Sequence, residues 1–146
     1  MTSGPPFFDH TVQDANIWLK AVATQLHCDD RHHEHSGLRA TLHALRDRQQ
    51  PQRAVHFGAR LPMVIRGLYC DDWRLDGKPT ADHSIDEFCV RVGKELPPKL
   101  PTDARTLSCG GFQVVFEQRD PGESAKVIDH FPVALRSLWP EVARCS

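Results

Sequence analysis

The segment PQRAVHFGARLPMVIRGLY (residues 51–69) decides the fold, because PGESAKVIDHFPVALRSLW (residues 121–139) repeats its pattern 70 positions later. The matched positions are Pro51, Leu61, Pro62, Arg66, Leu68 and Tyr69 against Pro121, Phe131, Pro132, Arg136, Leu138 and Trp139. A repeat of this length is a supersecondary unit that buries its apolar face by packing against another copy. We therefore predict two related halves, residues 11–75 and 81–142, within one compact domain spanning 11–146.

The same offset relates apolar residues upstream of these segments. Trp18, Val22 and Leu26 are matched by Phe88, Val92 and Leu96. Apolar residues three and four positions apart share one face of a helix. The spacing therefore predicts an amphipathic helix at the start of each half, over residues 11–26 and 84–96. Ser84 followed by Glu87 is the capping-box sequence that starts the second of these helices.

Polar caps and prolines mark the remaining helices. Asp29 and Asp30 offer an N-cap for the second helix of the first half, and Thr102 offers one in the second half. The short helices begin at Pro51, Pro62, Pro121 and Pro132. Residues 71–82 form the link between the halves, and no alternation of period two indicates a strand. The predicted fold is all-α, with about eight helices in two four-helix halves.

Composition indicates a soluble globular protein. The 146 residues are 40% hydrophobic and 25% charged, with a net charge of −1. Residues 1–10 contain two prolines and a glycine and are predicted to be a flexible lead-in. No apolar run approaches the roughly 20 residues of a membrane helix, and no signal-peptide pattern begins the chain. These features, with five widely spaced cysteines and no C-x-x-C pair, predict a cytoplasmic protein with free thiols.

The HHEH cluster suggests a metal site as one alternative. His32 and His35 are three residues apart, so on a helix both imidazoles could bind one ion, and His33 and His27 are close in sequence. The spacing is not H-E-x-x-H, and no third ligand is fixed. A solvated first helical turn accounts for the cluster equally simply, so we predict no metal ligand.

Residues 31–66 are strongly biased toward arginine. They contain seven arginines, no lysine and two acidic residues, a formal charge of +5 against −6 for the rest of the chain. Arg39, His43 and Arg46 share one helical face, and Arg53, His56 and Arg60 share another. Arginine binds carboxylates and phosphates bidentately. We predict Arg39, Arg46, Arg53 and Arg60 as a partner-binding face; ordinary solvated helix faces are the simpler alternative.

Arg66 and Arg136 are among the few polar residues that both halves share. Equivalent placement predicts a structural role, such as bonding to helix-end carbonyls or to an acidic residue of the other half. A matched pair of ligand-binding arginines is the alternative. Tyr69 and Trp139 follow three residues later, and we expect each to pack against the opposite half.

The sequence lacks the motifs of nucleophilic catalysis and of nucleotide binding. No G-x-S-x-G, Walker A or dinucleotide glycine pattern occurs. Cys109 precedes two glycines, but no base is fixed near it, and a free cysteine most often behaves as a small apolar residue. We predict no catalytic residue and no cofactor.

Two segments carry a family resemblance. LPMVIRGLYCDDWRLDGKP (61–79) and DDRHHEHSGLRATLHALRDRQ (29–49) resemble the prokaryotic family catalogued as domain of unknown function 2267. The resemblance covers residues 11–139 and implies a compact all-helical fold of two related halves, with no accepted activity or site to carry over. The chain departs from the family pattern at His35, at Gln49 and at Cys70-Asp71-Asp72.

These observations favour a helical binding or interaction module over an enzyme. The expected partner is an acidic protein at the arginine-rich face, or a second copy of the chain. The first alternative is a metal-binding protein or metal-dependent enzyme that uses His32, His33 and His35. The second alternative is a nucleic-acid-binding protein that uses the arginines; near-neutral net charge argues against it, because DNA-binding domains are usually strongly basic.

Overall fold

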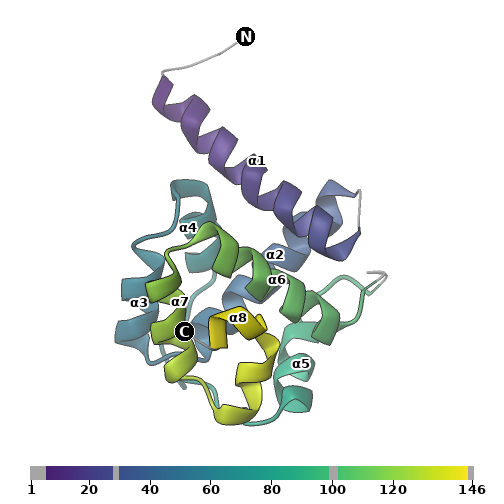
Figure 1. The fold of residues 1–146 in the computed structure, drawn as a ribbon, viewed down its shortest axis with the longest axis vertical. Helices are drawn as coiled ribbons and strands as arrows, with labels where there is room; N and C mark the ends of the chain where they lie inside the picture. The colour runs from purple at the N-terminus through teal and green to yellow at the C-terminus, as the bar shows by residue number, and fades with distance from the viewer. Residues whose placement is uncertain (1–5, 28–29, 99–101, 145–146) are drawn as a thin grey trace.

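The computed structural model describes residues 6–27, 30–98 and 102–144 (Figure 1). The chain runs through α1 (Pro6–Leu26), α2 (Arg31–Asp47), α3 (Pro51–Gly58), α4 (Met63–Cys70), α5 (Ile85–Gly93), α6 (Ala104–Gln118), α7 (Pro121–Asp129), the 3-10 helix η1 (Val133–Leu138) and α8 (Glu141–Arg144). The described residues contain no strand, so the all-α prediction is confirmed. The last predicted helix is a 3-10 helix, and the short α8 follows it after Pro140.

Most helices begin where the sequence predicts. Asp30 caps α2 by accepting a hydrogen bond from the His32 amide, and Pro51 occupies the first turn of α3. Ser84 and Glu87 form the complete capping box at α5. The predicted cap at Thr102 is wrong by one residue: the Asp103 carboxylate accepts the Thr106 amide at 2.8 Å. The other candidate, Asp29, lies outside the described residues.

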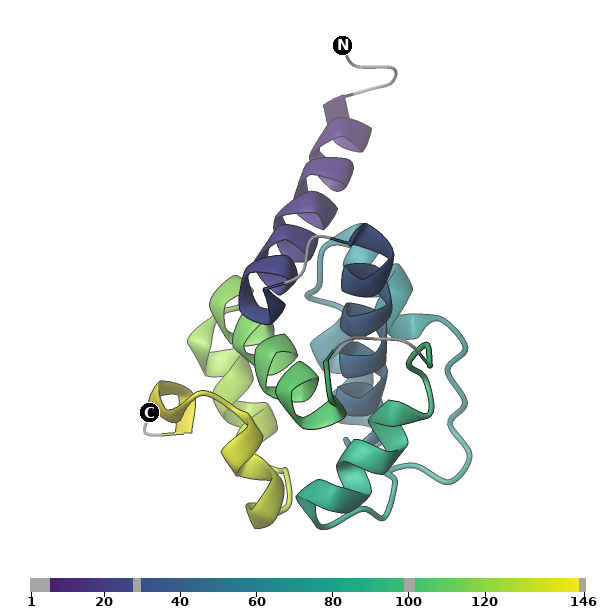
Figure 2. The same ribbon diagram turned by 90° about the vertical axis from the view of Figure 1, so that its right-hand side faces the viewer.

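Helix α1 begins earlier than predicted. Residues 6–10 are helical and do not form a flexible lead-in, while residues 1–5 lie outside the described part. The N-terminal part of α1 projects beyond the other helices (Figures 1 and 2), which leaves Phe7, Phe8 and Val12 more than half exposed. Further along the same helix, Trp18 is buried where α1 packs against the body.

Helices α2 and α6 cross at the centre of the molecule, and both are largely buried. A Cβ on Gly111 of α6 would lie 2.4 Å from the methyl carbon of Thr41 on α2, so only glycine allows the two backbones this close. The hydrophobic core continues through both predicted halves, with Leu42 from α2, Phe88 from α5 and Trp139 after η1.

The two segments that define the sequence repeat each contain the same internal hydrogen bond, from an arginine to the carbonyl five residues before it. The Arg66 guanidinium donates to the Leu61 carbonyl at 3.0 Å, and Arg136 donates to the Phe131 carbonyl at 3.1 Å. Both arginines therefore bond backbone carbonyls of the turn that precedes their own helix, and Arg136 also donates to the Asp129 carbonyl at the end of α7 at 2.9 Å. The duplication of whole halves stays a prediction.

The prediction that Tyr69 and Trp139 pack against the opposite half is corrected by their ring contacts. Tyr69 contacts Phe57 and Trp73 in its own half. Trp139 stacks on Phe112 at 4.6 Å between ring centroids, also in its own half. Tyr69 lies in the last turn of α4 and Trp139 directly follows η1, so each ring contacts other aromatic rings of its own half. No helix among the described residues is long and apolar enough to cross a bilayer.

Candidate functional site

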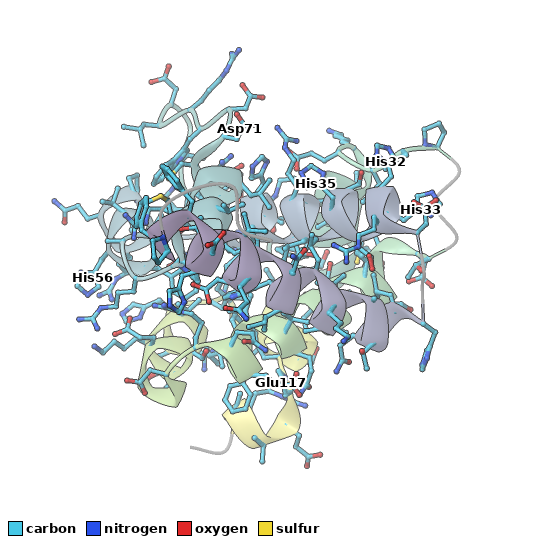
Figure 3. All side chains as sticks on the ribbon, turned by 90° about the horizontal axis from the view of Figure 1, so that it is seen from above. His32, His33, His35, His56, Asp71 and Glu117 are labelled. Carbon is cyan, nitrogen blue, oxygen red and sulfur yellow. The ribbon has the colours of Figure 1, made fainter. Side chains whose placement is uncertain are left out.

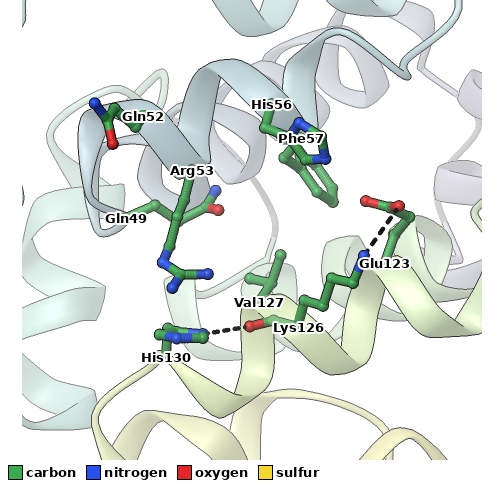
Figure 4. Close-up of a pocket in the computed structure, with 9 residues that line it drawn as sticks. All are labelled: Gln49, Gln52, Arg53, His56, Phe57, Glu123, Lys126, Val127 and His130. Atoms are coloured by element: carbon green, nitrogen blue, oxygen red, sulfur yellow. Dashed lines mark hydrogen bonds and ion pairs between the residues drawn. The ribbon is translucent and has the colours of Figure 1, made fainter.

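A pocket of about 300 Å³ lies between α3 and α7. Its lining residues are Gln49, Gln52, Arg53, His56, Phe57, Glu123, Lys126, Val127 and His130 (Figure 4). Clefts of this size fall at the lower end of the range for small-molecule sites, in which an apolar lining carries a few placed polar groups.

The floor of the pocket is apolar and rigid. Phe57 on α3 and Val127 on α7 are buried, with 2% and 6% of their surfaces exposed. The Phe57 ring packs against the Tyr69 ring at 5.9 Å between centroids. The Arg119 guanidinium lies 5.3 Å from the centre of the Phe57 ring. These contacts fix the ring, so the floor exists before any ligand arrives.

Basic side chains surround the opening. Figure 4 shows the Arg53 guanidinium reaching from α3 toward the imidazole of His130 at the end of α7. Nδ1 of His130 donates to the Lys126 carbonyl at 2.8 Å, because a carbonyl oxygen can only accept. Within residues 6–27, 30–98 and 102–144, no carboxylate lies within ion-pair distance of Arg53. Arg53 is therefore an exposed cation beside an apolar cavity.

Glu123 is the one carboxylate among the lining residues, and it is already paired. Its Oε1 lies 3.5 Å from Nε of Arg60 and 3.9 Å from Nζ of Lys126, and its side chain is 8% exposed. Arg53, Arg60 and Lys126 outnumber the single carboxylate of Glu123, so the pocket region carries a surplus of positive charge. At one end Arg53 contributes a cation without an ion-pair partner among the described residues, and Arg60 and Lys126 share Glu123 at the other.

Arg119 adds a partly buried cation behind the floor. Its Nη1 donates to the Arg60 carbonyl, whereas Nε and Nη2 are buried and have no hydrogen-bond partner among the described residues. Burial lowers the pKa of the Arg119 guanidinium below its ordinary value, and nearby Glu123 opposes that shift. The guanidinium is thus held mainly by Phe57 and one carbonyl.

Residues 15–138 match the sequence model of a family described as uncharacterized conserved protein DUF2267. The chain belongs to this family. The match extends from α1 to the end of η1 and includes every residue that lines the pocket, so the pocket is part of the DUF2267 region itself. Comparison with curated proteins finds no match.

The four arginines predicted as one face of this DUF2267 protein are divided by the structure. Arg53 and Arg60 on and after α3 are exposed and belong to the pocket region. Arg39 on α2 is bound to Asp71 at 2.9 Å, a hydrogen bond that lowers the pKa of that carboxyl. It lies with the segment after α4, away from the pocket lining.

Arg46 corrects the prediction most clearly. It is 3% exposed and donates to the carbonyls of Tyr69 and Asp71 at 2.7 and 3.0 Å. Its Nε also meets the Asp47 carboxylate at 2.8 Å, and the guanidinium lies 5.5 Å from the centre of the Trp73 ring. The helical spacing on α2 was read correctly, but α4 and the segment after it cover that face.

The histidine cluster does not form a convergent site. His32 and His35 are exposed on α2, and His33 lies 3.6 Å from the Asp30 carboxylate (Figure 3). In the part of the chain that the structure describes, no three His, Cys, Asp or Glu side chains are placed to hold a metal ion. Figure 3 places His56, which lines the pocket, on the opposite side of the molecule. Cys28 lies outside the described residues.

Cys109 is half-buried on α6 and carries a free thiol. Burial raises the pKa of this thiol, which disfavours the thiolate that a nucleophile requires. Arg105 nearby opposes the shift only in part.

Sequence reasoning missed the α7 wall of the pocket, although the repeat contained the signal. Adding 70 to Arg53, His56, Phe57 and Arg60 gives Glu123, Lys126, Val127 and His130, all of which line the pocket. The two walls therefore come from equivalent positions of the predicted halves. Only the tertiary structure shows that these positions line the two sides of one pocket.

Proposed function

We propose that this DUF2267 protein is a non-catalytic binding module, and that Arg53 and Lys126 at the α3–α7 pocket contact an acidic partner protein. One observation carries the proposal: Arg53 lies unpaired beside an apolar cavity whose own carboxylate, Glu123, is bound to Arg60. An acidic side chain of a partner would supply the missing counter-charge. Charge-assisted bonds of this kind to arginine are among the stronger polar contacts.

The internal bonds of the other arginines support the same location. Arg39 and Arg46 are committed to Asp71 and to backbone carbonyls, so neither guanidinium is free to recruit a partner. The exposed basic residues of the predicted face are thereby concentrated at α3, opposite Lys126. Complementary charge at such a surface chiefly increases association rate and specificity.

Charge reversal tests the proposal. The probe is a fluorescein-labelled peptide of glutamates and serines, and fluorescence anisotropy at low ionic strength measures its affinity. We expect the double variant Arg53→Glu/Lys126→Glu to bind at least about tenfold more weakly than the unaltered chain. Arg74→Glu is the matched control, because it reverses an exposed charge that does not line the pocket. Equal affinity of all three proteins would reject the pocket as the contact.

Self-association is the second candidate, and the exposed Phe7, Phe8 and Val12 on the projecting part of α1 favour it. Sedimentation velocity of the protein alone distinguishes self-association from binding to a different acidic protein. A second copy acts as partner only if the sedimentation coefficient rises with protein concentration. Val12→Asp, placed on that apolar face, would then restore the monomer.

Nucleic-acid binding through the same cations makes a different prediction. Affinity for a labelled duplex or single strand would fall steeply with salt, because phosphate contacts release counterions. Absence of any gel retardation at low ionic strength would exclude it. For the metal-binding alternative, elemental analysis of protein purified without a histidine tag is decisive: a stoichiometric metal that is lost on replacing His32, His33 and His35 would support it.

A further inference from the structure

We propose that the α3–α7 pocket recognises an acidic residue adjacent to a bulky apolar residue of the partner. The carboxylate would bind Arg53 beside His130, and the apolar side chain would pack on Phe57 and Val127. This recognition rests on the proposed function and specifies the chemistry of the segment that is bound.

The first support is an asymmetry between the two ends of the pocket. At one end the Glu123 carboxylate lies 3.5 Å from Arg60 and 3.9 Å from Lys126, so the cations there already have an anion. The other end is formed by the positions equivalent to Glu123 and Arg60 in the 70-residue repeat. Arg53 is equivalent to Glu123, and His130 is equivalent to Arg60, so both side chains at that end are basic. Figure 4 shows these two side chains facing each other. That end therefore has donors but lacks the carboxylate that completes the other end.

The second support is the position of Glu123. Its buried carboxylate already serves as the counter-ion of Arg60 and Lys126, and it would repel a second acid placed beside it. An incoming anion is thereby directed to Arg53, whose planar guanidinium binds a carboxylate with two parallel hydrogen bonds. The pocket accordingly selects one acidic group at a defined end, rather than a continuous run of negative charge.

The third support is the apolar floor between the two ends. Phe57 and Val127 line the cavity, yet each is nearly buried, so their exposed edges lie at the base of a recess. A carboxylate alone would fill only part of a volume of about 300 Å³. A leucine- or phenylalanine-sized side chain next to the acid would occupy the rest and remove apolar surface from water.

Two peptides of equal length and charge test this recognition. Both carry a fluorescein label and the same glutamates; one has leucine after each glutamate, and the other has serine. We expect the unaltered protein to bind the leucine peptide about tenfold more tightly, since that ratio corresponds to burial of part of one leucine side chain. Val127→Thr keeps the shape of the floor but adds a hydroxyl, and should remove most of this preference.

The outcomes distinguish failure of the acid–apolar recognition from failure of the acidic-partner function on which it rests. If both peptides bind equally and Arg53→Glu weakens both, the acidic-partner function stands and the acid–apolar recognition is overturned. If neither peptide binds, or Arg53→Glu leaves binding of both unchanged, the proposed function itself fails. The comparison uses the unaltered protein, so it remains decisive even if the Val127→Thr variant does not fold.

Discussion

Arg46 illustrates how one buried side chain organises its surroundings. Its guanidinium joins α2 to the carbonyls of Tyr69 and Asp71 at the end of α4, and it lies over Trp73. A guanidinium has five donors and no acceptor, and carbonyls at a helix end need donors. The side chain therefore holds the turn after α4 against the central helix.

We predict that Arg46→Met lowers the free energy of unfolding by about 3 kcal/mol, because it leaves buried carbonyls and the Asp47 carboxylate without their donor. Urea denaturation followed by circular dichroism measures the loss. Arg53→Met is the matched control: the side chain is exposed, so a change within about 0.5 kcal/mol is expected. Equal unfolding midpoints for the two variants would contradict the role assigned to Arg46.

Tyr69 predicts an alkaline loss of stability. Burial raises the pKa of its phenol well above the ordinary value, and its hydroxyl donates to the Ala54 carbonyl at 2.7 Å. The unfolded chain loses this proton near pH 10, whereas the native state keeps it, so the native state binds more protons. The free energy of unfolding should therefore fall as the pH rises above about 10.

The measurement is direct because Tyr69 is the single tyrosine of the chain. Tyrosinate absorbance should appear only together with the loss of helical circular dichroism. Tyr69→Phe should lower stability at neutral pH by about 1 kcal/mol and should reduce the alkaline dependence. Tyrosinate formation in a fully helical protein would show that the phenol is not protected by the fold.

At the scale of elements, the crossing of α2 and α6 depends on close backbone approach. Gly111 faces Thr41, and a Cβ there would lie 2.4 Å from the threonine methyl carbon and 2.8 Å from the threonine Cβ, which cannot move without its backbone. The two central helices contact α1, α3, α4, α5, α7 and η1, with α3 packed on α2 and α7 packed on α6. Separation at this crossing would therefore alter the relative position of the pocket walls.

We predict that Gly111→Ala destabilises the protein by about 1–3 kcal/mol, although alanine is the better helix former. Gly67→Ala is the control, for which the expected change in stability has the opposite sign. Gly67 lies in α4 with no atom within 4 Å of the position of a Cβ, so alanine there should stabilise by about 0.5–1 kcal/mol. Thermal melts of the two variants that shift in the same direction would contradict the close packing of α2 on α6.

At the scale of the whole molecule, the core joins segments from both predicted halves. Helix α6 packs on α1 and α2 as well as on α5 and α7, and α5 packs on α2. Trp18 and Leu42 from the first half belong to the same cluster as Phe112 and Trp139 from the second. We therefore expect each half to need the other to bury its apolar face.

We accordingly predict that fragments cut near Gly77 do not fold separately. Fragments 1–77 and 78–146 should each show little helical circular dichroism and no cooperative melt, whereas calorimetry of the full chain should give one transition. Mixing the fragments should restore helical signal if the shared core is sufficient. Two fragments that each melt cooperatively would instead divide the chain into two domains.

The sequence alone determined the helical class, most helix starts and the family, because apolar spacing, capping residues and prolines act within a few positions of the chain. The carbonyl bonds of Arg66 and Arg136 were predictable for the same reason. Only the tertiary structure decided which charged side chains are exposed: Arg46 and Arg53 look alike in sequence, yet Arg46 is buried against α4, whereas Arg53 is exposed among the residues that the structure describes. The pocket also required the tertiary structure, because α3 packs on α2, α7 packs on α6, and the crossing of α2 and α6 sets where the two pocket walls lie. Local patterns specify how a helix begins and which face is apolar; which faces meet is set by the sum of many distant contacts.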